Sequence, residues 1–149
     1  MTKLDVSPAS EPAGAAVLAA VESINALAAF NRWAGFEVVS ASPGEVELRM
    51  PWRDEAGQYS GFLHAGLIGA LIDTACGFAA STVAGRVLAS HFSVNCLAPA
   101  VGQRFVAKAR VIKAGRRQVF TSAELYSEDA ATPSRKLVAT GDAILVPAA

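Results

Sequence analysis

The sequence of 149 residues contains little cysteine and no surplus of charge of either sign. Its two cysteines, Cys76 and Cys96, belong to no CxxC pair and to no set of metal-ligand spacings, so we expect neither a disulfide framework nor a metal site. Thirteen basic residues balance thirteen acidic ones, and no run of Lys or Arg exceeds two. This charge pattern gives no reason to expect binding to nucleic acid or to an acidic membrane surface.

Long hydrophobic runs and several catalytic motifs are also missing. The alanine-rich stretch 13–20 follows acidic residues, whereas a signal peptide has a basic flank. No stretch reaches the roughly 18 uncharged apolar residues that span a bilayer. Neither a GxSxG elbow nor a P-loop occurs, which disfavours a serine hydrolase of that kind and a kinase. We expect a reduced cytoplasmic protein that does not bind a membrane.

Apolar side chains, by contrast, are abundant. Hydrophobic residues make up 52% of the chain and charged residues 17%, against roughly 25% charged in an average soluble domain. This excess indicates burial beyond a single chain, as in an oligomer. Residues 1–13 are mostly polar, contain two prolines and have no periodicity. We therefore predict a loose N-terminal tail over 1–13 and one domain over 14–149.

The spacing of apolar residues predicts the order of helices and strands. Steps of three and four predict a helix over 14–33, and an uninterrupted apolar run predicts a buried helix over 65–80. A turn sequence at 42–44 joins two strands of a hairpin. The predicted strands are 36–40, 45–51, 87–97, 103–113, 118–126 and 136–146. Together these elements indicate an α+β domain in which a six-stranded antiparallel sheet wraps round a buried helix.

A single carboxylate, Asp73, lies in the middle of this apolar helix. An ionised carboxylate that is buried without partners is strongly destabilising, and the flanking Leu71, Ile72 and Phe78 leave little polar surface around it. Burial also raises the pKa of a carboxyl group, which suits a general base. We therefore interpret Asp73 as a functional residue.

The start of the same helix is a candidate oxyanion site. Gly61 and the triplet 64–66 place backbone N–H groups at the positive end of the helix dipole, where they would stabilise a developing oxyanion. From Ala65 to Asp73 is eight residues, or about 12 Å along a helix, whereas an attacking group must approach the carbonyl carbon to about 3–3.5 Å. One helix cannot easily supply both groups. Two antiparallel copies related by a two-fold axis can, which predicts a dimer with two interfacial sites.

The remaining candidates have simpler interpretations. His64 suits a loop-fixing hydrogen bond, and His91 has no acidic or thiol partner nearby in the sequence. Cys76 is three residues from Asp73 but free cysteines commonly serve as buried packing residues. The turn KAGRR, 113–117, is either a solvated turn or a contact for phosphates.

The pattern Gln58-x5-His64-Ala65-Gly66-x6-Asp73, followed by SVNCLAPAVG and KAGRR, resembles the hotdog-fold acyl-CoA thioesterases. It is most similar to the phenylacetate-pathway (PaaI-type) branch related to 4-hydroxybenzoyl-CoA thioesterases, over about 36–146. The resemblance implies a hotdog fold and hydrolysis of an acyl-CoA to a carboxylic acid and free CoA. It implies no cofactor apart from the CoA of the substrate. We expect self-association as a homodimer, and the sequence leaves open whether dimers pair again into a tetramer, a dimer of dimers.

The resemblance also implies a role for each matching position. Asp73 acts as nucleophile, or as general base towards water, on the thioester carbonyl. The backbone N–H of Ala65 polarises that carbonyl across the dimer interface, Gln58 positions the thioester or the water, and His64 orders the loop. The expected substrate contacts are Gly66, Phe62, Arg116 and Arg117.

Some assignments stay open. The family usually has glycine at the position of Ala65, and alanine is compatible if the loop does not need a positive φ. The expected hydroxyl near the acid is Thr74, Ser81, Thr82 or Ser90. The acyl group is not fixed by the sequence, because aryl and aliphatic tails are served equally by Phe62, Leu67 or Phe92. The alternatives are a non-catalytic acyl-CoA or fatty-acid binding module and a hotdog hydratase or dehydratase, which would want an Asp and a His on one helix.

Overall fold

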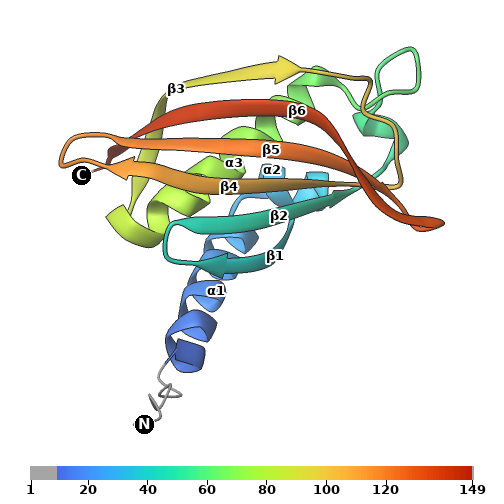
Figure 1. Ribbon diagram of the computed structural model, residues 1–149. Helices are drawn as coiled ribbons and strands as arrows, with labels where there is room; N and C mark the ends of the chain where they lie inside the picture. Colours follow the sequence, from blue (N-terminus) through green and yellow to red (C-terminus); the bar gives the residue numbers. More distant parts are fainter. Residues whose placement is uncertain (1–9, 149) are drawn as a thin grey trace, which may run out of the picture.

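The computed structural model describes residues 10–148 (Figure 1). The helices are α1 (Ser10–Leu27), α2 (Ala29–Ala34) and α3 (Ala65–Ala84), with a short 3-10 helix η1 (Asp54–Ala56). The strands are β1 (Glu37–Ser42), β2 (Glu45–Pro51), β3 (Val87–Cys96), β4 (Arg104–Ala114), β5 (Val119–Asp129) and β6 (Thr132–Pro147).

The six strands form one sheet in the order β1-β2-β4-β5-β6-β3. Every neighbouring pair is antiparallel. Helix α3 lies along one face of the sheet and packs against the strands that curve round it (Figure 1). The predicted six-stranded antiparallel sheet around a central helix is therefore confirmed.

Alternation along the strands builds the core between the sheet and α3. On β2, Val46, Leu48 and Met50 are buried, while the residues between them face away. Strand β5 repeats this pattern, with alternate residues from Val119 onward buried. One hydrophobic cluster joins these side chains to the buried side of α3. A period of two on the strands thus supplies one apolar face, as the sequence predicts.

The predicted hairpin of β1 and β2 is also confirmed. Ser42 pairs with Glu45 across the turn, and Gly44 adopts a φ of +80°, which favours glycine. The Gly44 N–H donates to the Thr82 hydroxyl at 2.7 Å. This bond ties the hairpin turn to the C-terminal end of α3.

The N-terminal helical region differs from the prediction in two ways. Helix α1 begins at Ser10, four residues before the expected start, and residues 1–9 of the predicted tail lie outside the described residues. The expected single helix over 14–33 is instead two helices, because Ala28 has an extended backbone (φ −82°, ψ 114°). The Asn25 side chain donates to the Phe36 carbonyl at 2.8 Å and accepts from the Asn31 amide at 3.0 Å. These bonds hold α1 and α2 around the break.

Helix α3 is long and apolar enough to cross a membrane by length and composition. However, nine of its 20 residues are buried inside the protein: Ile68, Gly69, Leu71, Ile72, Ala75, Cys76, Phe78, Ala79 and Ala80. Its hydropathy is therefore explained by its place as the core helix beneath the sheet.

Strand β3 lies at an edge of the sheet, because it pairs only with β6. None of its ten residues is buried. Two of its large apolar side chains, Leu88 and Phe92, are 63% and 47% exposed. The edge therefore combines free backbone hydrogen-bonding groups with apolar side chains.

Candidate functional site

Helix α3 begins at Ala65 because the preceding residue caps it. His64 has an extended backbone (φ −60°, ψ 136°), and its Nδ1 accepts the Gly66 N–H at 2.8 Å. The His64 N–H donates in turn to the Ala56 carbonyl at 2.9 Å. His64 thereby fixes the helix start to the loop before it, and it lies exposed at the surface.

The two amides after His64 are not equivalent. The structure corrects the expectation that the Gly66 N–H is free, because that N–H is taken by the His64 ring. A Cβ at Gly66 would lie 2.9 Å from the same ring nitrogen, so this glycine allows the close approach of the cap. Within residues 10–148, the Ala65 N–H has no acceptor. Ala65 is exposed and has a negative φ, so the structure leaves one available donor at the helix start.

A tight loop before the helix holds Gln58 in place. The Gln58 N–H donates to the Phe62 carbonyl at 2.8 Å, and the Gly61 N–H donates to the Gln58 carbonyl at 3.0 Å. Gly61 adopts a φ of +81°, which closes the loop. The Gln58 side-chain oxygen accepts the Ser60 N–H. This leaves the side-chain nitrogen as the part of Gln58 that is not bound to the described chain.

A hollow of about 510 Å³ lies between this loop and the segment that follows β3. It brings together four of the predicted site residues, Gln58, Phe62, His64 and Ala65. Its remaining lining is mostly apolar and consists of Tyr59, Leu63, Ile68, Cys96, Leu97, Ala98, Pro99 and Ala100. The candidate oxyanion donor, the Ala65 N–H, thus lies at the wall of a mostly apolar hollow.

Asp73 does not line this hollow. It lies on the same helix eight residues after Ala65, so that in one chain the two are about 12 Å apart along α3. The side chain is half-buried, and no hydrogen bond or ion pair to it exists within the described part of the chain. Burial raises the pKa of the Asp73 carboxyl. The carboxylate therefore remains free to act on a group brought from outside its own chain.

Cys76, one turn further along α3, is fully buried. Burial raises the pKa of its thiol to about 11. Since the thiolate is the reactive form of cysteine, this environment gives Cys76 the character of a packing residue.

The structure narrows the four candidates for the hydroxyl near Asp73. The Ser81 hydroxyl donates to the Phe78 carbonyl at 2.7 Å. The Thr82 hydroxyl accepts the Gly44 N–H of the hairpin turn. Both lie about 12 Å or more from Asp73 along the helix. Ser90, on β3, donates to the Ile144 carbonyl at 3.2 Å. Thr74 and Ser90 remain as the candidates.

Arg116 and Arg117 lie at the other end of the protein from the hollow. Their turn joins β4 to β5 on the side of the C-terminal end of α3 (Figure 1). The Val111 N–H donates to the Gly44 carbonyl at 2.8 Å, which places the end of β4 beside the same hairpin turn. Because α3 is about 30 Å long, one chain does not bring these arginines to Ala65.

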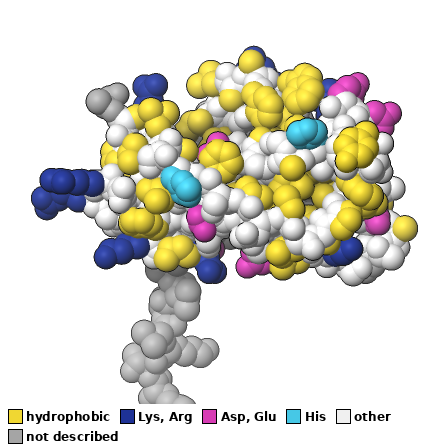
Figure 2. Space-filling view, turned by 90° about the horizontal axis from the view of Figure 1, so that it is seen from above, with side chains coloured by type: hydrophobic (Ala, Val, Ile, Leu, Met, Phe, Trp, Pro, Cys, Tyr) yellow, Lys and Arg dark blue, Asp and Glu magenta, His cyan; other side chains and the backbone are white. Residues whose placement is uncertain are grey.

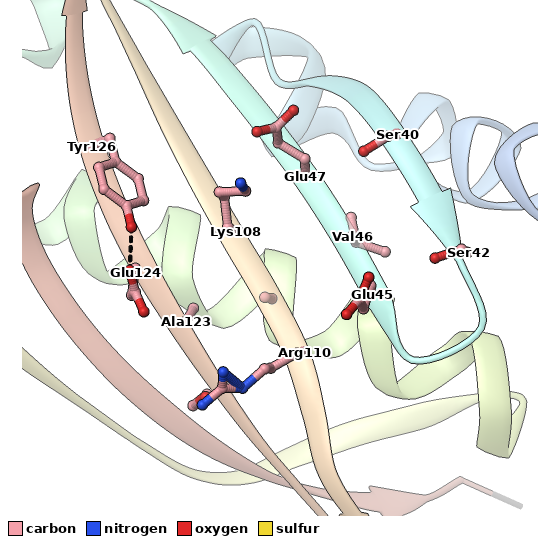
Figure 3. Close-up of a pocket in the computed structure, with 12 residues that line it drawn as sticks. Ser40, Ser42, Glu45, Val46, Glu47, Lys108, Arg110, Ala123, Glu124 and Tyr126 are labelled. Atoms are coloured by element: carbon pink, nitrogen blue, oxygen red, sulfur yellow. Dashed lines mark hydrogen bonds between the residues drawn. The ribbon is translucent and has the colours of Figure 1, made fainter. Parts of the chain in front are cut away.

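A second groove, of about 460 Å³, lies on the face of the sheet away from α3 (Figure 3). Its exposed side chains are polar and of both charges, including Glu45, Lys108, Arg110 and Glu124. The Tyr126 hydroxyl donates to Glu124, and this hydrogen bond raises the pKa of Tyr126. None of the predicted site residues lies there, and the groove offers an apolar acyl tail little contact.

Two parts of the hollow were not predicted from the sequence. Tyr59 stands at the tip of the loop and is 100% exposed, and the segment 96–100 forms the opposite wall. The segment belongs to the stretch SVNCLAPAVG, which carries part of the resemblance to the hotdog thioesterases. That resemblance was the signal by which the sequence could have placed the segment in the site. Tyr59 carried no such signal, because its exposure depends on the loop conformation.

Comparison with known proteins gives two matches that show the family of the chain. The profile of the Thioesterase superfamily matches residues 60–134, about half of the chain. The crystal structure of a thioesterase family protein from Silicibacter pomeroyi has a TM-score of 0.80 and 35% sequence identity, covering 85% of this chain and 93% of that one.

Two further relatives are more limited. The PaaI protein of the phenylacetic acid degradation operon of E. coli has a TM-score of 0.82 and 17% identity, over 92% of this chain and 96% of that one. This likeness concerns the fold alone, and it confirms the predicted hotdog fold. A candidate esterase of Halobacterium salinarum is 36% identical over 89 residues, which are 54% of this chain and 58% of that protein. The chain thus matches little more than half the length of this curated relative.

Proposed function

The chain belongs to the thioesterase superfamily, a family of thioester hydrolases, and we propose that it hydrolyses an acyl-CoA to a carboxylic acid and free CoA at sites shared by two copies of the chain. One observation carries the proposal. The Ala65 N–H and the Asp73 carboxylate, which have no hydrogen-bond partner within residues 10–148, lie eight residues or about 12 Å apart along α3, which is too far for them to act on the same carbonyl in one chain.

The chemistry needs these two groups and water. The thioester oxygen accepts the Ala65 N–H, which stabilises the negative charge that develops on it. The partner's Asp73 either removes a proton from the attacking water or attacks the carbonyl carbon itself. The carbon–sulfur bond then breaks. When Asp73 acts as base, the leaving thiolate takes up the proton that Asp73 removed from water. When Asp73 acts as nucleophile, the acyl group stays on its carboxylate as a mixed anhydride, and water hydrolyses this anhydride in a second step that frees Asp73 and supplies the proton for the thiolate. The products are the carboxylic acid and CoA.

The free edge of β3 supports pairing with a second copy. A long exposed edge that carries apolar side chains readily pairs with another strand. Seen from the side of β3, hydrophobic side chains spread over much of this face (Figure 2). The exposed large apolar residues of β3 and its neighbouring segments are Val83, Leu88, Phe92, Leu97 and Val101.

A single two-fold axis could bring Ala65 to the partner's Asp73 and also pair β3 with its copy. If Ala65 faces the partner's Asp73, the axis passes level with the midpoint of the two, Gly69, which is itself buried beneath Phe92. Antiparallel pairing of β3 with its copy over the full strand is centred on His91 and Phe92. These two centres lie next to each other, since a Cβ added at Gly69 would lie 3.4 Å from Cε2 of Phe92. One two-fold axis therefore fits both the antiparallel pairing of α3 and the antiparallel pairing of β3.

The same symmetry predicts where Arg116 and Arg117 of the partner subunit lie. In an antiparallel pair the C-terminal end of the partner's α3 lies towards the N-terminal end of the other helix. The partner's Arg116 and Arg117 then approach the hollow beside Ala65, where they would meet the phosphates of CoA. The further pairing of dimers into a tetramer and the cytoplasmic location stay predictions.

The experiment measures thiol release from acyl-CoA substrates by two variants and their mixture. Ala65→Pro removes only the N–H, because proline is well accommodated at the first position of a helix and His64 already has the extended backbone that a following proline requires. Asp73→Asn removes the carboxylate. Ala65→Gly, which keeps the N–H, is the control for Ala65→Pro.

Each variant alone is expected to lose activity by about 10²-fold or more. Mixed in equal amounts under conditions of subunit exchange, half of the dimers combine one chain of each kind and contain one intact site. The mixture should recover about a quarter of the wild-type activity. Loss without recovery would place both groups in one chain and contradict the shared site, whereas saturable binding without turnover by the wild type would favour a binding module.

A further inference from the structure

We propose that the ring of Phe92 closes the acyl side of each site and thereby sets the length of acyl group that the protein accepts. This inference rests on the proposed function. It names a specificity-determining residue, and it is carried by the contact between Phe92 on β3 and Gly69 on α3.

Gly69 lies halfway between the two reacting groups. It follows Ala65 by one turn and precedes Asp73 by one turn, so the three positions share one face of α3. The ring of Phe92 lies over this turn, where a Cβ at Gly69 would reach its Cε2 at 3.4 Å. The ring is nevertheless 47% exposed, so it is placed against the helix without being part of the closed core.

The two sides of the thioester carbonyl have different surroundings. On one side the hollow of about 510 Å³ opens past Gln58 and the fully exposed Tyr59. CoA is long and charged, and its phosphates must remain hydrated or paired, so CoA leaves by this open side. The other side leads along α3 to Gly69 and Phe92, where α3 packs in the hydrophobic core of the protein. The acyl group is therefore directed towards the ring.

A Cβ added at Gly69 would meet the ring at 3.4 Å, an ordinary van der Waals distance, so the ring lies directly against this turn of the helix. Near the axis the two Phe92 rings would lie beside each other, between the two sites. An acyl chain that extends past its own site must displace one of them. The ring thus acts as an end wall, and the size of residue 92 determines how far the acyl group reaches.

The test compares thiol release from straight-chain acyl-CoAs of increasing length. Phe92→Ala is expected to raise kcat/KM for the longest chains relative to the shortest by about tenfold or more, since each added methylene in an apolar pocket changes specificity by about 10-fold or more. Phe92→Trp should shift the preference to shorter chains. Phe92→Leu is the conservative variant in case Phe92→Ala does not fold or dimerise, and it should shift the preference in the same direction to a smaller extent.

Phe120→Leu is the matched control. Phe120 is 39% exposed on β5, between the buried Val119 and Thr121, so it faces the other side of the sheet. Its variant should keep the wild-type chain-length profile. If the profile is also unchanged in folded, dimeric Phe92 variants of an active protein, the inference is wrong and the proposed function stands. If the wild type releases no thiol from any acyl-CoA, both are wrong.

Discussion

Nδ1 of His64 accepts the backbone N–H of Gly66 at 2.8 Å, so that the histidine beside the candidate oxyanion donor serves as the N-terminal cap of α3. An imidazole nitrogen that accepts a backbone N–H is not available in that role as a base at the same time. The cap also determines which amide stays free, since Gly66 is occupied and Ala65 is not. This arrangement gives His64 a structural role at the start of α3.

The first prediction concerns this cap. His64→Ala should lower the free energy of unfolding by about 1 kcal/mol, because an N-cap acceptor is lost. His64→Asn should restore most of that loss, since asparagine is among the best N-cap residues. Urea unfolding of the three proteins measures both effects. Equal destabilisation by Ala and Asn would contradict the capping role.

The second prediction concerns the stability cost of Asp73. Burial raises the pKa of its carboxyl in the folded state, so folding takes up protons there and the free energy of unfolding falls as the pH rises from the unfolded pKa of about 4 through the folded pKa. Asp73→Asn should therefore be more stable than the wild type at pH 7, and this advantage should disappear below about pH 4.

Asp129→Asn, at an exposed acid on β5, is the control for the loss of one negative charge. It should leave the unfolding free energy close to that of the wild type at both pH values. A destabilised Asp73→Asn variant at pH 7 would show that the carboxylate is held by favourable contacts, contrary to the absence of partners in the described chain.

The third prediction concerns the pH dependence of activity. Whether Asp73 is base or nucleophile, it must be ionised to act. Because burial raises its pKa, kcat should fall on acidification at a pH above the ordinary carboxyl range of about 4. A pH profile of kcat between pH 4 and 8 measures this limb. If kcat falls only at or below pH 4, burial does not raise the pKa of the carboxyl group that reacts.

The fourth prediction concerns the edge strand. Leu88→Lys places a charge on the exposed edge of β3, where such charges oppose strand pairing, and it should weaken dimerisation by tenfold or more in Kd, which is about 1.4 kcal/mol. Ile112→Lys, on β4, is matched in exposure, with 57% against 63%, and should leave the dimer intact. Analytical ultracentrifugation of both variants measures this. Equal dimerisation by the two would argue against β3 as the interface.

The fifth prediction compares two glycines of α3. Alanine in place of Gly77 meets no atom within 4 Å, so Gly77→Ala should stabilise the protein by up to about 1 kcal/mol through helix propensity. The same change at Gly69 puts a Cβ at 3.4 Å from the Phe92 ring and, in the proposed dimer, next to the axis. Gly69→Ala should weaken the dimer despite its better propensity. Unchanged sedimentation of Gly69→Ala would contradict an axis at this residue.

Much of the fold was predictable from local pattern. The period of two in β2, β4 and β5, the turn at 42–44 and the apolar run of α3 each follow from neighbouring residues, and the structure confirms these elements. The break at Ala28 was not predictable in this way. It is held by the Asn25 side chain, which reaches Phe36 eleven residues later, and such a contact leaves no periodic signal.

The candidate site was predictable in part. Asp73 in an apolar helix and the helix start at Ala65 were both visible as local anomalies of composition and spacing. Which amide at the helix start is free was not visible, because it depends on the orientation of one imidazole ring. The opposite wall at 96–100 was marked in the sequence only by its motif, because the segment meets the loop only in the folded chain.

The sequence by itself determined the elements, the position of the carboxylate and the rise of about 12 Å that separates it from the helix start. These depend on residues that are close along the chain. Only the tertiary structure decided that β3 is an edge strand, because the order β1-β2-β4-β5-β6-β3 does not follow the chain. Only the tertiary structure places Phe92 against Gly69, which lies 23 positions earlier in the sequence. Contacts of this kind arise from long-range packing, which the periodicity of a single segment does not encode.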